Sequence, residues 1–194
     1  MKFAELYTIK KPYFGYEEIA RVLGIRPSSA KVSAGRYVQQ GLLLRIKKNM
    51  YVLRETLNNA GREEKFVLAN LGQSPSYISL MTALDYCEIT TQLQRDTIEC
   101  IALKRTKEIG VNEQIFRYTK IKKDLFFGFV KKKDFFIATP EKALLDAFYL
   151  MSYGRYGLDL SALDREKVDV DQMGRYFPEK TRSLLKKHGY LGSA

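Results

Sequence analysis

The chain has 194 residues, with 33 Lys and Arg against 22 Asp and Glu, so its formal net charge is +11. This length suits one compact domain or two small ones, and a hydrophobic content of 45% excludes an intrinsically disordered chain. The longest apolar run, at 125–130, has six residues, whereas a membrane helix needs ~18–20. The first eleven residues also lack the apolar core of a signal peptide. Two cysteines, Cys87 and Cys100, are too few for a disulfide scaffold or a four-ligand zinc site. We therefore expect a cytoplasmic protein with reduced thiols, no metal site and no membrane association.

The excess positive charge lies in two blocks. Residues 1–60 have a net charge of +7 and residues 117–133 a net charge of +6, whereas 61–116 sum to −2 and 134–194 to zero. Concentrated positive charge suits a polyanion, because each neutralised phosphate releases counterions. The alternative is a basic surface that only keeps the protein soluble.

Two short helices are predicted at the amino-terminal end. An apolar stripe marks the first over residues 15–23, and Gly24 ends it. Pro27 is preset for the first turn of the second helix, which runs to about residue 40, and Ser28 and Ser29 are placed to satisfy free amides there. Two helices with a short glycine-containing connection are typical of a helix-turn-helix.

The second helix has two different faces at 100° per residue. Its inner face carries Ala30, Ala34, Tyr37 and Val38, and its small residues allow close packing on the first helix. The outer face is polar and cationic, and it comprises Ser28, Ser29, Val32, Arg36 and Gln39, with Lys31 on its flank.

Strand-like runs at 42–46 and 51–53 follow, separated by a basic tip, and this order predicts a winged helix-turn-helix. The second helix would then offer donors to base edges, and the wing would offer ammonium groups to phosphates. The predicted DNA-binding residues are Arg26, Ser28, Ser29, Lys31, Val32, Arg36, Gln39, Arg45, Lys47, Lys48 and Asn49. The alternative is a winged helix that contacts a protein partner.

The rest of the chain mixes helical and strand patterns. Helices are predicted over 62–71, 77–87, 141–151, 170–176 and 179–187, and strands over 97–103, 114–119, 125–130 and 135–138. Thr139 and Pro140 form a strong start for the helix over 141–151. The predicted fold class is α+β: a winged helix-turn-helix over residues 1–58, then a mixed α+β domain over 59–194 with a small, mainly antiparallel sheet.

The second basic block surrounds the predicted strand at 125–130. It comprises Lys120, Lys122, Lys123, Lys131, Lys132 and Lys133. These lysines are either solvated turn residues that discourage edge pairing or a second surface that contacts DNA phosphates.

Residues for catalysis are scarce. His188 is the only histidine, and no glycine-rich phosphate loop occurs. Glu63 and Lys65 have a spacing found in some nucleases, but no acid on a preceding strand accompanies them. We expect no enzymatic activity and no cofactor.

Three segments resemble a known family. Residues 24–52, 75–84 and 137–146, the last reading Ile-Ala-Thr-Pro-Glu-Lys-Ala-Leu-Leu-Asp, are similar to AbiEi-type antitoxins of abortive-infection type IV toxin–antitoxin systems. The resemblance implies a transcriptional repressor that binds its own promoter, for which we expect inverted-repeat operator DNA. It also implies a functional pairing with a nucleotidyltransferase-like toxin without a stable complex. The alternative is an antitoxin or adaptor that occupies its protein partner directly.

Overall fold

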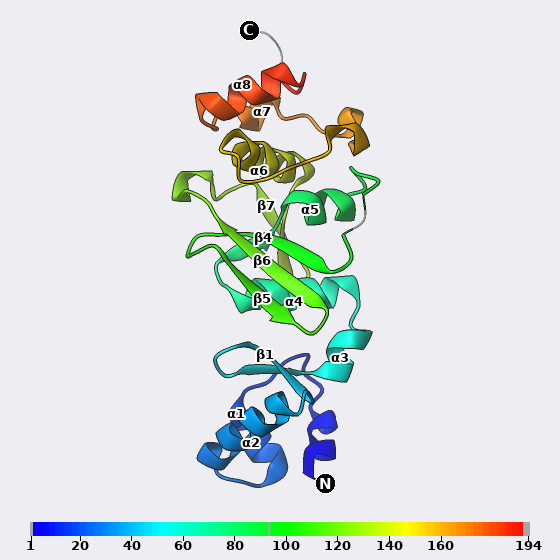
Figure 1. The fold of residues 1–194 in the computed structure, drawn as a ribbon, viewed down its shortest axis with the longest axis vertical. Helices are drawn as coiled ribbons and strands as arrows, with labels where there is room; N and C mark the ends of the chain where they lie inside the picture. The colour runs from blue at the N-terminus through cyan, green and yellow to red at the C-terminus, as the bar shows by residue number, and fades with distance from the viewer. Residues whose placement is uncertain (1, 93, 192–194) are drawn as a thin grey trace.

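The computed structural model describes residues 2–92 and 94–191 and has a mixed α+β fold. The elements are stacked along one long axis, from the amino-terminal helices at one end to α8 (Glu179–Lys187) at the other (Figure 1). Within these residues, no helix combines the length and apolar character that crossing a bilayer requires.

The amino-terminal part contains three helical segments and a hairpin. The second and third helical segments and the hairpin lie where the sequence predicts them, whereas the first segment was not predicted. They are η1 (Lys2–Thr8), α1 (Tyr16–Leu23), α2 (Pro27–Gln39), β1 (Leu43–Lys47) and β2 (Met50–Leu53). Gly24 adopts φ 62° at the end of α1, where the following amide donates to the Ala20 carbonyl at 3.0 Å. This left-handed residue turns the chain directly into α2.

The start of α2 differs from the prediction in one detail. Arg26 is the N-cap, in the extended conformation that a following proline favours, and no side-chain hydrogen bond caps this helix. Ser28 and Ser29 are instead exposed inside the first turn of α2.

A second sheet occupies the middle of the molecule. Within the described residues, six strands form it in the order β5-β6-β4-β3-β8-β7. Their bounds are β3 (Ser76–Ile78), β4 (Thr97–Ala102), β5 (Lys107–Val111), β6 (Gln114–Lys120), β7 (Phe129–Lys132) and β8 (Phe135–Ala138). Pairs β3–β8 and β4–β6 are parallel, and the other three pairs are antiparallel. The sheet is therefore larger and more mixed than predicted.

Helices cover both faces of this sheet. The hydroxyl of Tyr118 on β6 donates to the Ala69 carbonyl of α4 (Arg62–Gly72) at 2.6 Å. Glu99 on β4 points to the opposite face, where its carboxylate accepts from the Met81 amide of α5 (Leu80–Tyr86) at 3.2 Å. Figure 1 accordingly shows α4 on one side of the strands and α5 on the other.

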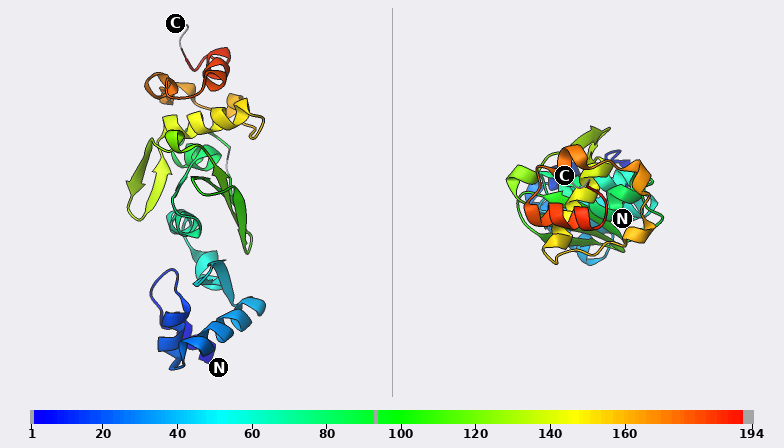
Figure 2. Two further views of the ribbon diagram at one scale, coloured as in Figure 1. Left: turned by 90° about the vertical axis from the view of Figure 1, so that its left-hand side faces the viewer. Right: turned by 90° about the horizontal axis from the view of Figure 1, so that it is seen from above.

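The carboxy-terminal helices stack on α6 (Pro140–Ser152), which crosses above the sheet (Figure 2, left). The predicted cap of α6 is confirmed, because the Thr139 hydroxyl accepts from the Lys142 amide at 3.3 Å. The remaining short segments are η3 (Leu160–Ala162), η4 (Arg165–Lys167) and α7 (Asp171–Gly174). His188 is the C-cap residue of α8.

Two predicted elements have the wrong boundaries. The segment 77–87 begins with strand β3, and its helix starts only at Leu80. In the segment 125–130, only the last two residues belong to a strand, β7. Leu125 ends a 3-10 turn, η2 (Lys123–Leu125), and a loop over 126–128 leads to β7. Both segments are rich in apolar residues, and in such short stretches periodicity alone separates helix from strand poorly.

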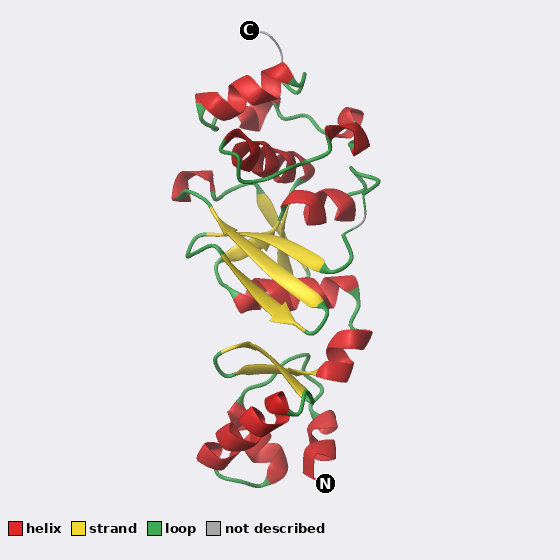
Figure 3. Cartoon of the chain, in the orientation of Figure 1, coloured by secondary structure: helices red, strands yellow, loops and turns green. Residues whose placement is uncertain are grey.

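The β1–β2 hairpin joins the two parts, as Figure 3 shows. Leu43 and Tyr51 pack into the amino-terminal core with α1 and α2, whereas Ile46 and Val52 belong to the core of the larger sheet. The short helix α3 (Arg54–Asn59) then leads from β2 to α4. The predicted domain boundary after residue 58 therefore lies after the hairpin, and the two faces of that hairpin pack into the cores of both parts.

Candidate nucleic-acid interface

The outer face of α2 is exposed and free of acidic side chains. Seven Lys or Arg and no Asp or Glu occur from Gly24 to Arg54. The predicted DNA-binding residues on α2 and at its N-cap are all exposed, namely Arg26, Ser28, Ser29, Lys31, Val32, Arg36 and Gln39. Val32 leaves 55% of its surface in solvent, which is high for an apolar residue. A helix face of this kind has the donors, the charge and the one apolar contact that reading a DNA major groove requires.

Two alanines fix the position of this face. Ala30 and Ala34 are completely buried in the amino-terminal core, one turn apart on α2. Because both side chains are single methyl groups, α2 lies close against α1, and its long polar side chains all point away from the core. The aromatic ring of Phe3 in η1 packs edge-on against Tyr37, 4.8 Å between centroids, and so holds the flank of α2.

Two residues of the predicted hairpin site also form hydrogen bonds within the protein. The Lys47 ammonium donates to the Leu71 carbonyl at 2.6 Å. Asn49 adopts φ 55° in the turn, and its side-chain oxygen accepts from the Tyr16 amide at 2.7 Å. Its side-chain nitrogen donates to the Glu17 carboxylate at 2.9 Å. Lys47 therefore caps the end of α4, and Asn49 holds the start of α1.

Two other hairpin cations remain exposed. The Arg45 guanidinium makes a long hydrogen bond of 3.3 Å to the Lys47 carbonyl and lies at the surface. Lys48 is exposed at the turn itself. Of the four predicted hairpin residues, these two keep a cationic group available to an external phosphate.

The second basic block is divided between two places. Lys120 is the last residue of β6 and Lys122 and Lys123 follow it, whereas Lys131, Lys132 and Lys133 lie on and beside β7. Strands β4, β3 and β8 separate β6 from β7, which at ~4.8 Å per strand places them about 19 Å apart along the sheet. The six lysines therefore do not form one patch.

Two of the three lysines near β7, Lys132 and Lys133, have partners within the protein. The Lys133 ammonium pairs with the Glu63 carboxylate at 2.7 Å, and that of Lys132 lies 4.9 Å from the centre of the Tyr86 ring. The Tyr86 hydroxyl also donates to Glu63 at 2.7 Å. These contacts lower the pKa of the Glu63 carboxyl, Lys133 contributing most. Glu63 is thus part of a surface ion pair.

Sequence reasoning missed a cationic cluster at the carboxyl end of α4. The Lys107 ammonium donates to the Gly72 carbonyl at 3.2 Å, beside the carbonyl that Lys47 caps. Burial lowers the pKa of Lys107, and the nearby charges of Arg105, Lys47 and Lys104 lower it further. Cations at a helix carboxyl end interact favourably with its dipole. These residues are far apart in the sequence, so no local pattern could have predicted the cluster.

The segment 137–146 builds a fully buried polar cluster. The Lys142 ammonium pairs with the Asp146 carboxylate one turn later on α6, and both side chains have no exposed surface. The same carboxylate accepts from the hydroxyls of Tyr77 at 2.9 Å and Ser79 at 2.8 Å. Burial raises the pKa of Asp146, and the Lys142 charge opposes this effect. The cluster joins α6 to β3 from inside the core.

No protein-family model matches this chain, and neither does the sequence of any curated protein. The candidate interface therefore rests on the residues and geometry described above.

Proposed function

We propose that α1, α2 and the β1–β2 hairpin form a winged helix-turn-helix that binds double-stranded DNA, with α2 in the major groove. The observation that carries this proposal is the outer face of α2, which is exposed, cationic and free of acidic residues. A protein surface that only needs to be soluble mixes charges of both signs. A surface of one sign instead suits the phosphates and the acceptor-rich edges of guanine bases.

The proposed contacts divide by chemistry. Arg36 and Lys31 would donate to base edges or to the phosphates that flank them, and the exposed Val32 would contact a thymine methyl group. Arg45 and Lys48 would contact the backbone next to the groove. Because Lys47 and Asn49 have partners inside the protein, the wing contributes less to phosphate binding than its sequence alone predicts.

The biological role follows from the family resemblance. We infer a transcriptional regulator that represses its own operon at an inverted-repeat operator and acts as the antitoxin of an abortive-infection system. Its partner would be a nucleotidyltransferase-like toxin, paired functionally and without a stable complex.

A titration of the chain's own upstream DNA tests the DNA-binding proposal. Fluorescence anisotropy at several salt concentrations would compare the wild type with Arg36→Ala and Lys48→Ala, and with Lys186→Ala on the distant helix α8 as the control. Loss of one phosphate contact flattens the plot of log affinity against log salt by about one unit, which is expected for Lys48→Ala. Loss of a base contact weakens binding by ~1–3 kcal/mol, which is expected for Arg36→Ala.

The alternative function gives different results in the same experiment. If α2 contacts a protein instead of DNA, wild type and all variants bind the duplex weakly and with one common salt slope. Co-purification of a partner protein that depends on Arg36 would then favour the antitoxin or adaptor module that acts by direct contact.

A further inference from the structure

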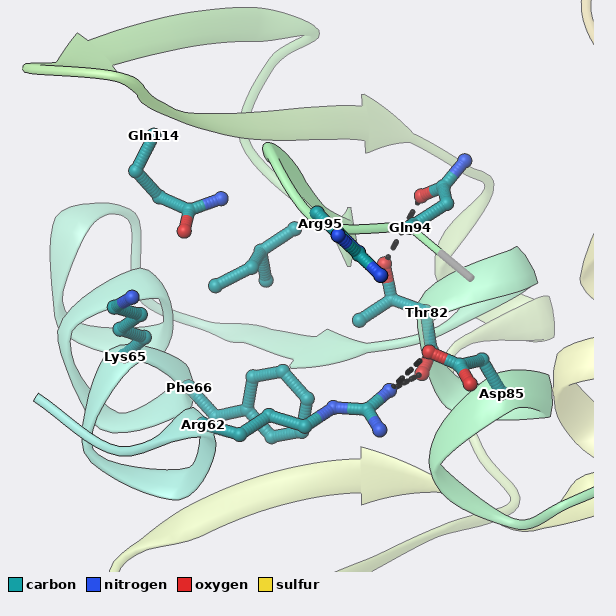
Figure 4. A pocket seen from close by; sticks show the side chains of 9 residues that line it. Arg62, Lys65, Phe66, Thr82, Asp85, Gln94, Arg95 and Gln114 are labelled. Carbon is teal, nitrogen blue, oxygen red and sulfur yellow. Dashed lines mark hydrogen bonds and ion pairs between the residues drawn. The ribbon is translucent and has the colours of Figure 1, made fainter. Parts of the chain in front are cut away.

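A polar cleft lies at the end of the larger sheet, away from the α2 face. It consists of two adjoining cavities of about 300 Å³ and 270 Å³, and both are lined by Lys65, Arg95 and Gln114. The first is drawn in Figure 4, where these three side chains surround one space together with residues of α4 and α5. Cavities of this size are at the lower limit of those that hold small molecules.

The first cavity has an excess of positive charge. Arg62, Lys65 and Arg95 line it, against the single carboxylate of Asp85. Arg62 is already neutralised, because its guanidinium pairs with Asp85 at 2.6 Å and donates to the Thr82 carbonyl at 3.2 Å. The charges that remain are those of Lys65 and Arg95.

Lys65 and Arg95 have no counter-ion in the part of the chain that the structure describes. Neither side chain forms an ion pair within residues 2–92 and 94–191, although Lys65 is half-buried. The acids Asp96 and Glu113 line the second cavity and not the first, so the positive excess is confined to the first cavity and the cleft as a whole is balanced; Arg95 is exposed. An anion is therefore expected in the first cavity, between the two unpaired cations.

Gln114 supplies an independent observation. It is the first residue of β6, has only 7% of its surface exposed, and lines both cavities. Its side-chain nitrogen is buried and has no hydrogen-bond partner among the described residues. A buried donor without a partner is costly and uncommon in folded proteins. In Figure 4 the amide of Gln114 is directed into the cleft, so a ligand with an acceptor atom there would satisfy it.

The inner wall of the first cavity is apolar. Phe66 and Ile98 line it, and both are almost fully buried. A ligand that fits this cleft thus has an anionic end, a body that tolerates an apolar wall, and an acceptor near Gln114. Two unpaired cations match a dianion better than a single carboxylate, and the planar guanidinium of Arg95 suits bidentate contact with phosphate oxygens.

We propose that this cleft binds a small organic phosphate, with the phosphate group between Lys65 and Arg95 and an acceptor of the organic part at the Gln114 amide. The phosphate belongs either to a free mononucleotide-sized metabolite or to the phosphorylated end of a nucleic-acid strand. This proposal does not depend on DNA binding by α2, because the cleft lies at the larger sheet in the middle of the molecule and α2 lies at one end (Figure 1).

Isothermal titration calorimetry tests the proposal with three probes: inorganic phosphate, adenosine monophosphate, and a short single strand with or without a 5′ phosphate. Saturable binding of adenosine monophosphate with a Kd below ~1 mM is expected. Lys65→Ala and Arg95→Ala should each weaken it by about tenfold or more, since each removes a charged partner of the phosphate. Lys186→Ala is the matched control and should leave the affinity unchanged.

The Gln114→Leu variant separates a ligand site from a merely structural one. We expect it to weaken binding of adenosine monophosphate more than binding of inorganic phosphate, and to leave the Tm of the ligand-free protein equal or higher. A lower Tm would mean that the amide already has a partner in solution, and it would overturn the role given to Gln114. A strand that binds only when phosphorylated, while adenosine monophosphate does not bind, assigns the site to nucleic-acid ends. Failure of every probe to bind, or binding that Lys65→Ala and Arg95→Ala leave intact, overturns the proposal.

Discussion

Replacing Lys142 by Met tests whether the buried ion pair holds the carboxy-terminal half of the fold together. The Lys142 ammonium has no exposed surface and lies 5.1 Å from the Phe127 ring centre and 5.0 Å from that of Phe177. Its carboxylate partner, Asp146, is equally buried and also accepts from Tyr77 and Ser79. Met has a similar length and packs well against rings, so the variant removes the charge with little change in packing.

The expected loss of stability follows from the groups left behind. Removal of one partner of a buried ion pair costs ~3–5 kcal/mol, because the other charge stays buried without compensation. Two hydroxyl donors still contact Asp146 in the variant, which places the expected loss near the lower limit, about 3 kcal/mol at neutral pH. For a protein of this size, that loss lowers the Tm by roughly 6–12 °C.

The pH dependence of the variant gives the sharper result. Burial raises the pKa of Asp146, and removal of Lys142 raises it further. A carboxyl group whose pKa is higher in the folded state binds its proton more tightly when folded, so folding stability falls as pH rises from the unfolded pKa through the folded pKa. The deficit of Lys142→Met relative to the wild type should therefore shrink as pH is lowered into that window.

Urea unfolding at several pH values measures this deficit. The double variant Lys142→Met with Asp146→Asn serves as the control, since it removes both charges and should recover most of the lost stability. A deficit that stays constant or grows as pH falls would refute the reasoning. So would a double variant that is no more stable than Lys142→Met.

Three further changes have expected outcomes that unfolding experiments can check. Gly72→Ala should destabilise the protein by ~1–3 kcal/mol, because the new methyl group would overlap the Tyr118 hydroxyl. The control Gly35→Ala, which meets open space inside α2, should raise stability by ~0.5–1 kcal/mol, and equal urea midpoints for the two variants would contradict the packing argument. Asn49→Ala should lower the free energy of unfolding by about 1 kcal/mol, because the first turn of α1 loses the Asn49 side chain as an acceptor. Asn49 also has a positive φ, which glycine adopts without strain, so Asn49→Gly should be the milder change. Thr139→Ala should also lower the free energy of unfolding by about 1 kcal/mol, because it removes the side-chain cap of α6. Thr139→Ser should retain the stability of the wild type, and an unchanged urea midpoint for Thr139→Ala would count against the cap.

Local signals in the sequence predicted the elements whose chemistry is local. A glycine at 24 and a proline at 27 define the turn between α1 and α2, and Thr139 with Pro140 defines the start of α6. Each of these residues acts on the backbone within a few positions, so its effect can be recognised without knowing the fold.

Interactions between distant segments explain what the sequence could not predict. The position of Asn49 in a basic turn predicts a DNA contact but gives no sign that its side chain also holds the start of α1, 33 residues earlier in the chain. Strand β3 has three residues and exists because β4 and β8 pair with it on either side. The cleft at Lys65, Arg95 and Gln114 likewise combines segments that only the folded sheet brings together.

The most direct test of the proposed function compares two duplexes of equal length and base composition, the chain's own upstream DNA and a scrambled sequence. Competition anisotropy at physiological salt gives the ratio of their affinities. If α2 reads bases in the major groove, the upstream duplex should bind about 10³-fold or more tightly, and Val32→Ala with Arg36→Ala should bring that ratio close to one. Equal affinity of the wild-type protein for both duplexes would contradict the assignment of α2 as a DNA-reading helix.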